Sequence, residues 1–526
     1  LRGMFAFAIW DSNRQKLFIA RDHLGQKPLF FYPGQKHFAF ASEIKAILAA
    51  FPMLRQVDLQ ALDQYLALRF IAAPLTMFSG ICKLPPGHYL EVDMDGQIHV
   101  QRYWDLPFEP KHSGSESDLL DEFEALLLET LELHMVSDVT VGAFLSGGID
   151  SGLLVSMLGK KITGEGLPTF SMGIPYGEHN EAPYARMVAE AVGANHHEYL
   201  IKPSLLDTLP DVVWHLDEPS DPLSVCTYLL SQETSKNVKV VIGGDGGDEL
   251  FGGYDRYYGN LYASWYAGLP DWLRRRVIGP VLDAMPDGNW YKSPVHKLKW
   301  LHSSSFTSGR RRYARSLSYF YFDDSIRSDL HGPRLSEIES SLRPYACLEE
   351  PYKRLEAQSP VDHMLYADMQ CRMPDHPVLI TDRMGMAFGL EARSPYLDHR
   401  MAEFAARLTV KYKIRGLTLR YLQFRLAQRY MPKAVLQRPK QGFSSALPYL
   451  LQDEYRQLFG CFLTDSRMVA EGFLNGETVS RMLAEHLAGQ RDHGNRLWLL
   501  VNAEVWYRLY IDRVSREELY GVIRAA

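Results

Sequence analysis

The sequence predicts an α/β protein in which a doubly wound parallel sheet is followed by a helical C-terminal part and preceded by antiparallel β structure. Three observations predict it. Between residues 139 and 242, apolar strand patterns alternate with helical patterns, an order that favours a parallel sheet. Residues 1–105 contain strand-length apolar runs separated by turn signals. Beyond Tyr254, apolar residues recur mostly at helical spacing.

The N-terminal region is expected to form one antiparallel sheet with two helices. The turn sequences at 11–14 and 33–36 join paired strands. The charged stretch 20–29 lies between two strands and is interpreted as a surface hairpin. We expect strands at 4–10, 17–20, 29–32, 38–41, 81–92 and 98–104, and helices at 42–50 and 59–69.

A second unit is expected to begin at an amphipathic helix. Residues 111–117 are polar, with one Gly and three Ser, and are interpreted as a linker. Ser117 is a suitable N-cap for a helix over 118–134, whose apolar side chains lie along one side. The chain is therefore divided into residues 1–110 and 117–526.

The stretch from Ser146 to Ser151 joins a buried strand to a helix. Its sequence, Ser146-Gly147-Gly148-Ile149-Asp150-Ser151, points backbone N–H groups and a helix N-terminus at an anion. The two glycines let a phosphate approach the backbone closely. Asp150 would repel a phosphate unless Mg²⁺ lies between them. The competing interpretation is an ordinary strand-to-helix turn. Neither G-x-x-x-x-G-K-[ST] nor G-x-G-x-x-G is present, which excludes the common P-loop and the dinucleotide fingerprint.

A second glycine-rich loop follows the strand at 238–242. It holds Asp245, Asp248 and Glu249 among four glycines. The carboxyl ends of parallel strands meet at one edge of a sheet, so a carboxylate of this loop together with Asp150 could hold Mg²⁺ on a nucleotide's phosphates. The competing interpretation is an acidic loop at a helix N-terminus, where carboxylates are favourable without any ligand.

Two later segments are dense in charge. Lys440, beside a Pro and a Gly, is suited to offset charge on a transferring phosphoryl group, although an exposed basic turn would look the same. Residues 389–400 carry both signs, and a salt-bridged helix junction is the competing interpretation for them.

The composition excludes several classes of function. The net charge of -6 over 526 residues predicts no bulk attraction to nucleic acid or to an anionic membrane. The five cysteines form no C-x-x-C pair, which excludes a zinc knuckle and a thiol-transfer motif. With no signal-peptide pattern and no membrane-length apolar run, a cytoplasmic protein is expected.

Taken in order, the motifs resemble those of the glutamine-dependent asparagine synthetase family over nearly the whole chain. The first unit then corresponds to the later part of a class II glutaminase domain, which is Ntn-hydrolase-like. The second corresponds to a synthetase domain with a PP-loop ATP pyrophosphatase core. The matching stretches are residues 1–11, 21–29, 42–46, 146–151, 170–173, 217–219, 244–254, 382–384, 391–398 and 438–443.

The resemblance implies a reaction. ATP and aspartate would form β-aspartyl-AMP and pyrophosphate, and ammonia from glutamine would then give asparagine and AMP. ATP and Mg²⁺ are the implied cofactors. The family's roles would fall on this chain as follows: pyrophosphate binding on Ser146, Gly147, Gly148 and Ser151; Mg²⁺ on Asp150 and Asp248; nucleotide contact on Leu145, Met172, Gly243 and Gly244; stabilisation of adenylyl transfer on Lys440; and proton removal from ammonia on Asp245.

Departures from the family pattern leave alternatives open. The chain starts at Leu1 inside a strand pattern, so we expect the family's N-terminal Cys nucleophile to lie upstream and this chain to use free ammonia and fail with glutamine. Gly243 stands where Ser or Thr is usual, and Asp245 where Glu is frequent. Another carboxylate, on a peptide, sugar or cell-surface polymer, is therefore an alternative to aspartate.

Other classes also remain open. A β-lactam-forming or thiolating ATP pyrophosphatase is one, although thiolation would require reactive cysteines. A non-catalytic nucleotide-binding regulator is another, against which the intact Asp150, Asp248 and Lys440 argue. A homodimer is one option for the assembly.

Overall fold

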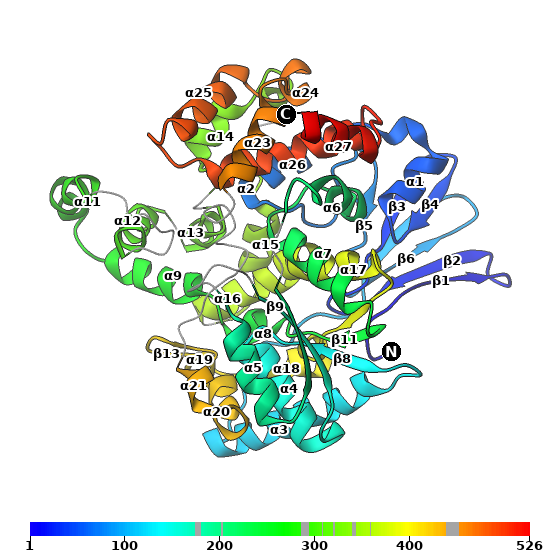
Figure 1. The fold of residues 1–526 in the computed structure, drawn as a ribbon, viewed down its shortest axis with the longest axis vertical. Coiled ribbons are helices and arrows are strands. Elements are labelled where there is room, and N and C mark those ends of the chain that lie inside the picture. Colours follow the sequence, from blue (N-terminus) through cyan, green and yellow to red (C-terminus); the bar gives the residue numbers. More distant parts are fainter. Residues whose placement is uncertain are drawn as a thin grey trace.

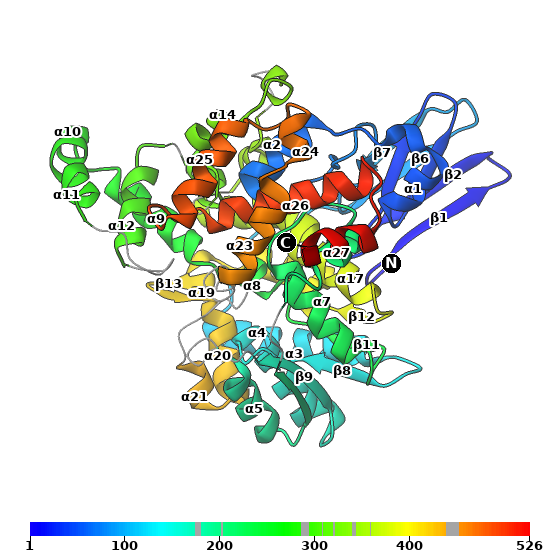
Figure 2. The same cartoon turned by 45° about the horizontal axis from the view of Figure 1, so that its top comes forward.

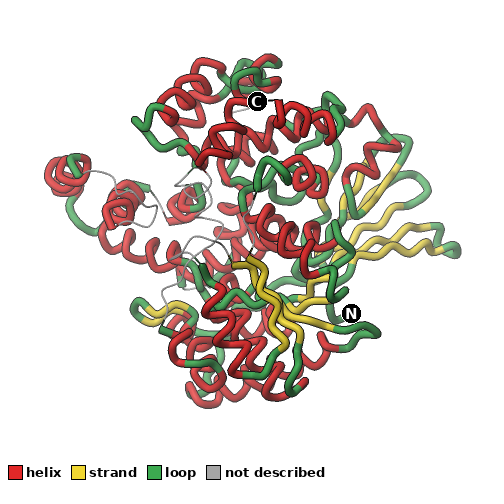
Figure 3. Tube along the Cα trace, viewed as in Figure 1, coloured by secondary structure: helices red, strands yellow, loops and turns green. Residues whose placement is uncertain are grey.

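Two groups of strands and one short hairpin organise the structure, as Figure 3 shows. The structure is a computed structural model that describes residues 1–173, 180–200, 204–285, 294–307, 309–318, 321–338, 343–357, 359–437 and 452–525. The first group is antiparallel and comes from the N-terminal region, and the second is a five-stranded parallel sheet. In Figure 1 the antiparallel sheets lie to the right of the helical body and the parallel sheet lies below it.

The predicted antiparallel β structure is confirmed, but its strands are divided between two sheets rather than joined in one. They form a four-stranded sheet in the order β1-β2-β6-β7 and a three-stranded sheet in the order β4-β3-β5. Ala6 of β1 lies opposite Arg21 of β2, and the turn between them closes at the Asp11–Lys16 pair. The elements of this region are β1 (Ala6–Asp11), β2 (Lys16–Arg21), β3 (Phe30–Pro33), β4 (Phe38–Ala41), α1 (Ile44–Ala50), α2 (Leu59–Leu68), β5 (Cys82–Lys83), β6 (His88–Val92) and β7 (Ile98–Arg102).

The five parallel strands run in the order β10-β9-β8-β11-β12. Alternate residues face opposite sides, as the pleat requires. Val240 and Ile242 pack in a core with α4 and α5, whereas Val241 packs on the other face with residues of α7. Helices therefore cover both faces, which confirms the doubly wound arrangement. The strands are β8 (Val141–Phe144), β9 (Pro168–Gly173), β10 (Asn195–Leu200), β11 (Val240–Ile242) and β12 (Glu391–Arg393).

The edge strand β12 corrects the interpretation of residues 389–400 as a helix junction. It pairs in parallel with β11, with Glu391 opposite Val240 and Arg393 opposite Ile242. The strand is three residues long and two of them are charged. The sequence therefore lacks the alternation of apolar residues that would predict a strand here.

The helix that opens the second unit starts earlier than predicted. It is α3 (Glu116–Met135), and its N-cap is Ser115 rather than Ser117. Ser115 and Asp118 form a reciprocal capping box, in which each side chain accepts a hydrogen bond from the other's backbone N–H. The helices around the parallel sheet are α4 (Ile149–Met157), α5 (Ala182–Ala191), α6 (Leu209–Leu216), α7 (Leu223–Thr234) and α8 (Gly247–Phe251).

A continuous helical segment, residues 360–386, passes through the interior. It consists of α16 (Pro360–Ala367), two π-helical stretches and α17 (Leu379–Met386). Several charged residues of this segment are buried and paired with other parts of the chain, among them Asp368, Arg372 and Arg383. The segment therefore ties distant elements together through ion pairs as well as apolar packing.

The C-terminal part is helical, as predicted. Helices α1 and α2 share one apolar core with α6, α23 and α26, so the N-terminal region is packed into the body. In Figure 2 the long helix α26 runs across the upper part of the molecule toward the N-terminal sheets. The remaining elements are α9 (Asp255–Tyr266), α10 (Asp271–Leu273), α11 (Gly279–Asp283), α12 (Pro294–Ser304), α13 (Gly309–Ser316), α14 (Asp324–Leu330), α15 (Ala346–Arg354), α18 (His399–Arg407), α19 (Val410–Lys413), β13 (Ile414–Arg415), β14 (Thr418–Leu419), α20 (Tyr421–Tyr430), α21 (Lys433–Leu436), α23 (Gln452–Leu463), α24 (Arg467–Ala470), α25 (Gly476–Leu487), α26 (Gly494–Tyr510) and α27 (Arg516–Ala525).

Within the described ranges, none of these helices combines the length and the apolar character that crossing a bilayer would require.

Candidate active site

The loop after β8 leads directly into α4 at the carboxyl edge of the parallel sheet. The Ser146 hydroxyl lies 3.0 Å from the Ser151 hydroxyl, and the Ser146 N–H donates to the same Ser151 oxygen at 3.1 Å. Gly147 has φ +72°, and a Cβ there would lie 2.8 Å from the backbone nitrogen of Ala185. The N-cap of α4 is Gly148, which has no side chain to cap the first turn. The loop thus presents an uncapped helix N-terminus at the surface, which is the geometry of an anion site.

The glycine-rich loop after β11 packs against the start of α4, because β8 and β11 are neighbours in the sheet. A Cβ on Gly244 would lie 3.0 Å from the backbone nitrogen of Ser151. A Cβ on Gly247 would lie 2.5 Å from Oδ1 of Asp150. Side chains at these two positions would force the loops apart, so the glycines allow the close approach.

Asp150 and Asp248 converge on one point. Nη1 of Arg420 lies 2.5 Å from Oδ2 of Asp150 and 3.0 Å from Oδ1 of Asp248. Two carboxylate oxygens within about 3 Å of one atom define a position for a cation, and carboxylate oxygens are the ligands that Mg²⁺ prefers. The residues present therefore fit the ion. Among the described residues, no set of three or more His, Cys, Asp or Glu side chains forms a metal-binding group. Further ligands would have to come from phosphate or water.

The three acids of the second loop have different environments. Glu249 is buried, forms a 3.0 Å ion pair with Arg372 and accepts a hydrogen bond from Tyr254, so it belongs to the internal packing. Among the described residues, no cationic side chain forms an ion pair with Asp245. Loss of hydration, followed by the nearby charge of Glu249, raises the pKa of Asp245 to about 7. A carboxyl with a pKa near neutrality is suited to take up and release a proton.

The structure brings together ten of the twelve predicted site residues. They lie on the two adjacent loops or in the first turns of the helices that follow them: Leu145, Ser146, Gly147, Gly148, Asp150, Ser151, Gly243, Gly244, Asp245 and Asp248. The Leu145 side chain is in the core, so only its backbone can face a ligand. Met172 lies at the carboxyl end of β9 on the same edge, with its side chain against an internal cluster. Lys440 falls within 438–451, outside the described residues.

Three residues at the site were not anticipated. Arg420 and Gln423, at the start of α20, both contact Asp150, and Gln423 also donates to the hydroxyl of Tyr396 at 2.9 Å. The Tyr396 hydroxyl lies 3.3 Å from the carbonyl of Asp150. Arg420 and Gln423 are about 270 positions from Asp150, and no local pattern linked them to it.

Four of the matched stretches meet at the contact between the N-terminal region and the body: 21–29, 42–46, 217–219 and 382–384. The stretch 20–29 is not a surface hairpin. Asp22 is buried and accepts hydrogen bonds from the N–H groups of Leu24, Gln26 and Lys27. Lys27 forms a 2.6 Å ion pair with Asp382 of α17. The polar side chains of the stretch 20–29 therefore form internal hydrogen bonds and ion pairs. Composition alone could not distinguish such a buried polar segment from an exposed one.

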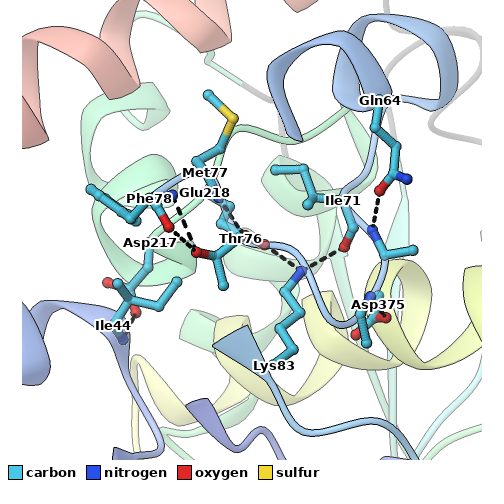
Figure 4. Close-up of polar contacts among 12 residues, drawn as sticks. Ile44, Gln64, Ile71, Thr76, Met77, Phe78, Lys83, Asp217, Glu218 and Asp375 are labelled. Carbon is cyan, nitrogen blue, oxygen red and sulfur yellow. Dashed lines mark hydrogen bonds and ion pairs between the residues drawn. The ribbon is translucent and has the colours of Figure 1, made fainter. Parts of the chain in front are cut away.

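Asp217 is the centre of the same contact. It accepts a hydrogen bond from the N–H of Ile44 at 2.8 Å, seen in Figure 4, and forms 2.8 Å ion pairs with Lys45 and Arg383. Arg383 also donates to the carbonyl of Ser42 at 3.0 Å. The body and the N-terminal region are thus held by one carboxylate with partners on both.

The adjacent residue, Glu218, forms a second buried ion pair across this contact, drawn in Figure 4. Nζ of Lys83 lies 2.7 Å from Glu218 and donates to the carbonyl of Ile71 at 2.5 Å. The N–H of Met77 donates to the same carboxylate at 3.2 Å. Lys83 and Glu218 are 2% and 5% exposed, so water cannot replace either partner.

The comparison with known families agrees with this arrangement. The asparagine synthase family model matches residues 122–508, and the glutamine amidotransferase domain model matches residues 1–104. The chain belongs to the asparagine synthase family. As a member of it, the protein is an ATP-dependent carbon–nitrogen ligase.

Several curated proteins are similar to this chain over most of its length. Asparagine synthetase (glutamine-hydrolyzing) 1 of Bacillus subtilis is 31% identical over 525 residues, covering 99% of this chain and 79% of the relative. Asparagine synthetase (glutamine-hydrolyzing) 3 of the same organism is 29% identical over 466 residues, covering 84% and 67%. Amidase chyE of Penicillium rubens is 30% identical over 450 residues, covering 79% and 65%. A solved glutamine-dependent NAD+ synthetase from Acinetobacter baumannii, with ADP bound, covers 48% of this chain and 62% of its own at 14% identity and a TM-score of 0.20, too low to support an argument.

Proposed function

We propose that this ligase makes asparagine. ATP and aspartate would give β-aspartyl-AMP and pyrophosphate, and ammonia would then attack the activated carboxyl carbon and release AMP. The family's asparagine synthase match over residues 122–508 supports this reaction, and the amidotransferase match over residues 1–104 supports glutamine as the source of ammonia. Such a ligase would work in the cytoplasm, where ATP is made available.

The observation that carries the proposal is the convergence of Asp150 and Asp248 beside the phosphate loop. In this proposal Ser146, Gly147, Gly148 and Ser151 bind the pyrophosphate portion of ATP, and Asp150 and Asp248 hold Mg²⁺. The ion, when bound, would neutralise phosphate charge and stabilise the leaving pyrophosphate. Leu145, Gly243 and Gly244 would contact the nucleotide, with Met172 nearby. Lys440 would stabilise adenylyl transfer.

Asp245 is proposed as the group that takes the proton from the attacking ammonia. Its carboxyl lies on the loop that follows β11, close to Asp150 and Gly243. At a pH above about 7 it is mostly ionised and can accept a proton. A Cβ added at Gly243 would lie 3.4 Å from its nearest neighbour, the Asp245 carboxylate. Because glycine has no side chain, this space beside the proposed base, Asp245, stays open.

Pyrophosphate release tests the proposal. The chain is incubated with ATP, Mg²⁺ and ammonium, with and without aspartate. We expect release to depend on aspartate and to fall by about 1,000-fold in Asp150→Ala, which removes a charge at the phosphate site. Asp121→Ala, an exposed acid on α3 that pairs with Arg429, is the control and should be unchanged.

The other outcomes decide between the alternatives. Release that is absent with aspartate but present with another carboxylate would retain the ligase and reject the substrate. ATP binding without release with any acid would contradict catalysis and favour a regulatory protein.

A pH profile tests the assignment of Asp245. With unprotonated ammonia held constant, the rate of asparagine formation should rise with pH through about 7 as Asp245 ionises. The Thr381 side chain hydrogen-bonds the Asp245 carboxyl and lowers its pKa, so Thr381→Val should move the rise to higher pH. Thr381→Ser, which keeps the hydroxyl, should restore the original profile. An unshifted profile in Thr381→Val would mean that another group limits the rate.

A further inference from the structure

Arg420 occupies the point where the two proposed metal-binding carboxylates meet. A single nitrogen, Nη1, contacts both Asp150 and Asp248. The side chain is 8% exposed, and a Cβ on Gly253 would lie 2.8 Å from Cδ of Arg420. The guanidinium is therefore enclosed and is the counter-ion that keeps two carboxylates close together.

The backbone holds Arg420 in this place. The residue lies between the β13–β14 hairpin and α20, at φ +54° and ψ +42°, and its carbonyl accepts the N–H of Phe424 at 2.8 Å. A left-handed conformation is uncommon for a residue with a side chain and recurs at functional sites. Within the described residues, Nε of Arg420 is buried and makes no hydrogen bond. A buried donor without a partner on a charged side chain is rare and calls for an explanation.

A metal ion between Asp150 and Asp248 would require a second arrangement of the Arg420 side chain. A divalent cation between Asp150 and Asp248 needs the same oxygens that Arg420 now contacts, and two cations cannot share that point. A displaced guanidinium in so enclosed a position needs a new anion, because a buried charge without a partner is strongly unfavourable. The anion that arrives together with the cation is the phosphate chain, which a guanidinium binds well through its forked donors.

We propose that Arg420 exchanges partners during nucleotide binding. In the free protein it closes the cation position by pairing with Asp150 and Asp248. When the metal–nucleotide complex enters, it leaves the carboxylates and binds the phosphates. Arg420 is then both a guard of the empty metal position and a phosphate ligand. This inference rests on the proposed function for the location of ATP, but not on the identity of the carboxylate substrate.

The first experiment measures Mn²⁺ binding without nucleotide, by electron paramagnetic resonance. Wild type should bind Mn²⁺ weakly, because Arg420 holds the site. Arg420→Met should bind it about tenfold more tightly or better, since removal of the guanidinium leaves two adjacent carboxylates free. Adding Asp248→Asn to Arg420→Met should remove this gain. Arg420→Lys, which keeps a cation, should bind Mn²⁺ as weakly as wild type and covers the case in which the Met variant folds poorly. Equal Mn²⁺ affinity in wild type and Arg420→Met would overturn the guarding role.

The second experiment measures the affinity for ATP in the presence of Mg²⁺. A residue that only blocks the site would bind ATP more tightly once removed. The exchange predicts the opposite, a loss of about 10- to 100-fold in Arg420→Met, because a charged hydrogen bond to phosphate is missing. Tighter binding of ATP in Arg420→Met would overturn the exchange.

Arg415→Met is the matched control. Arg415 lies five residues earlier in the hairpin, its side chain is 60% exposed, and it pairs with Glu116 away from the site. Both affinities should be unchanged in this variant. Neither binding experiment uses aspartate or ammonia, so a failure of asparagine synthesis would leave their outcomes intact.

Discussion

Asp245→Asn is expected to stop amide formation while leaving adenylylation in place. The substitution keeps the size of the side chain but removes its ability to accept a proton, which should lower the rate of asparagine formation by about 100- to 10,000-fold. Adenylylation should persist, because Asp150 and Asp248, not Asp245, form the pair at the cation position. The measurement is ATP–pyrophosphate exchange with aspartate, compared with asparagine formed from ammonium.

Asp248→Asn provides the contrast, because it alters the proposed metal pair three residues further along the same loop and should lower both activities. Asp245→Glu, which restores a carboxyl group, should recover part of the amide formation. Equal losses of exchange and amide formation in Asp245→Asn would contradict the division of labour between the two acids.

The sequence predicted that the two glycine-rich loops meet, because the rule involved is topological. Strands β8 and β11 each end in a glycine-rich loop, and neighbouring parallel strands place their carboxyl ends together. The contacts of Gly244 with Ser151 and of Gly247 with Asp150 follow from that single fact. The residue pattern alone did not distinguish the three acids of the second loop, and only the family resemblance gave Asp245 and Asp248 separate roles. That distinction depends on Arg372, which reaches Glu249 from the interior helical segment.

What the sequence missed depends on contacts between distant residues. Arg420 lies about 270 positions from Asp150 and meets it only because α20 packs against α4. The error on the stretch 20–29 has the same origin. A carboxylate such as Asp22 can be buried when backbone N–H groups surround it, yet its local sequence resembles that of an exposed turn. A polar side chain is reliably exposed only when the fold supplies no internal hydrogen-bond partner for it.

The contact between the N-terminal region and the body contains the other large predicted effect. Lys83→Met should lower the free energy of unfolding by about 3–5 kcal/mol, because it leaves the buried Glu218 without its charged partner. Chemical denaturation measures the change. Lys236→Met is the control, since Lys236 is 61% exposed and its pair with Glu233 should contribute about 0.5 kcal/mol or less.

The loss in Lys83→Met should also depend on pH, with a definite sign. Burial raises the pKa of Glu218, and Lys83 counteracts this, so removal of Lys83 should raise that pKa further. Above this folded-state pKa the unpaired carboxylate is charged and costly; below it the carboxyl is neutral. The destabilisation should therefore shrink as the pH falls through this raised pKa. Replacing Glu218 by Leu in the same chain should recover much of the stability, because an apolar pair needs no charge partner. A small, pH-independent loss in Lys83→Met, unaffected by the second substitution, would mean that the ion pair does not hold the two parts of the chain together.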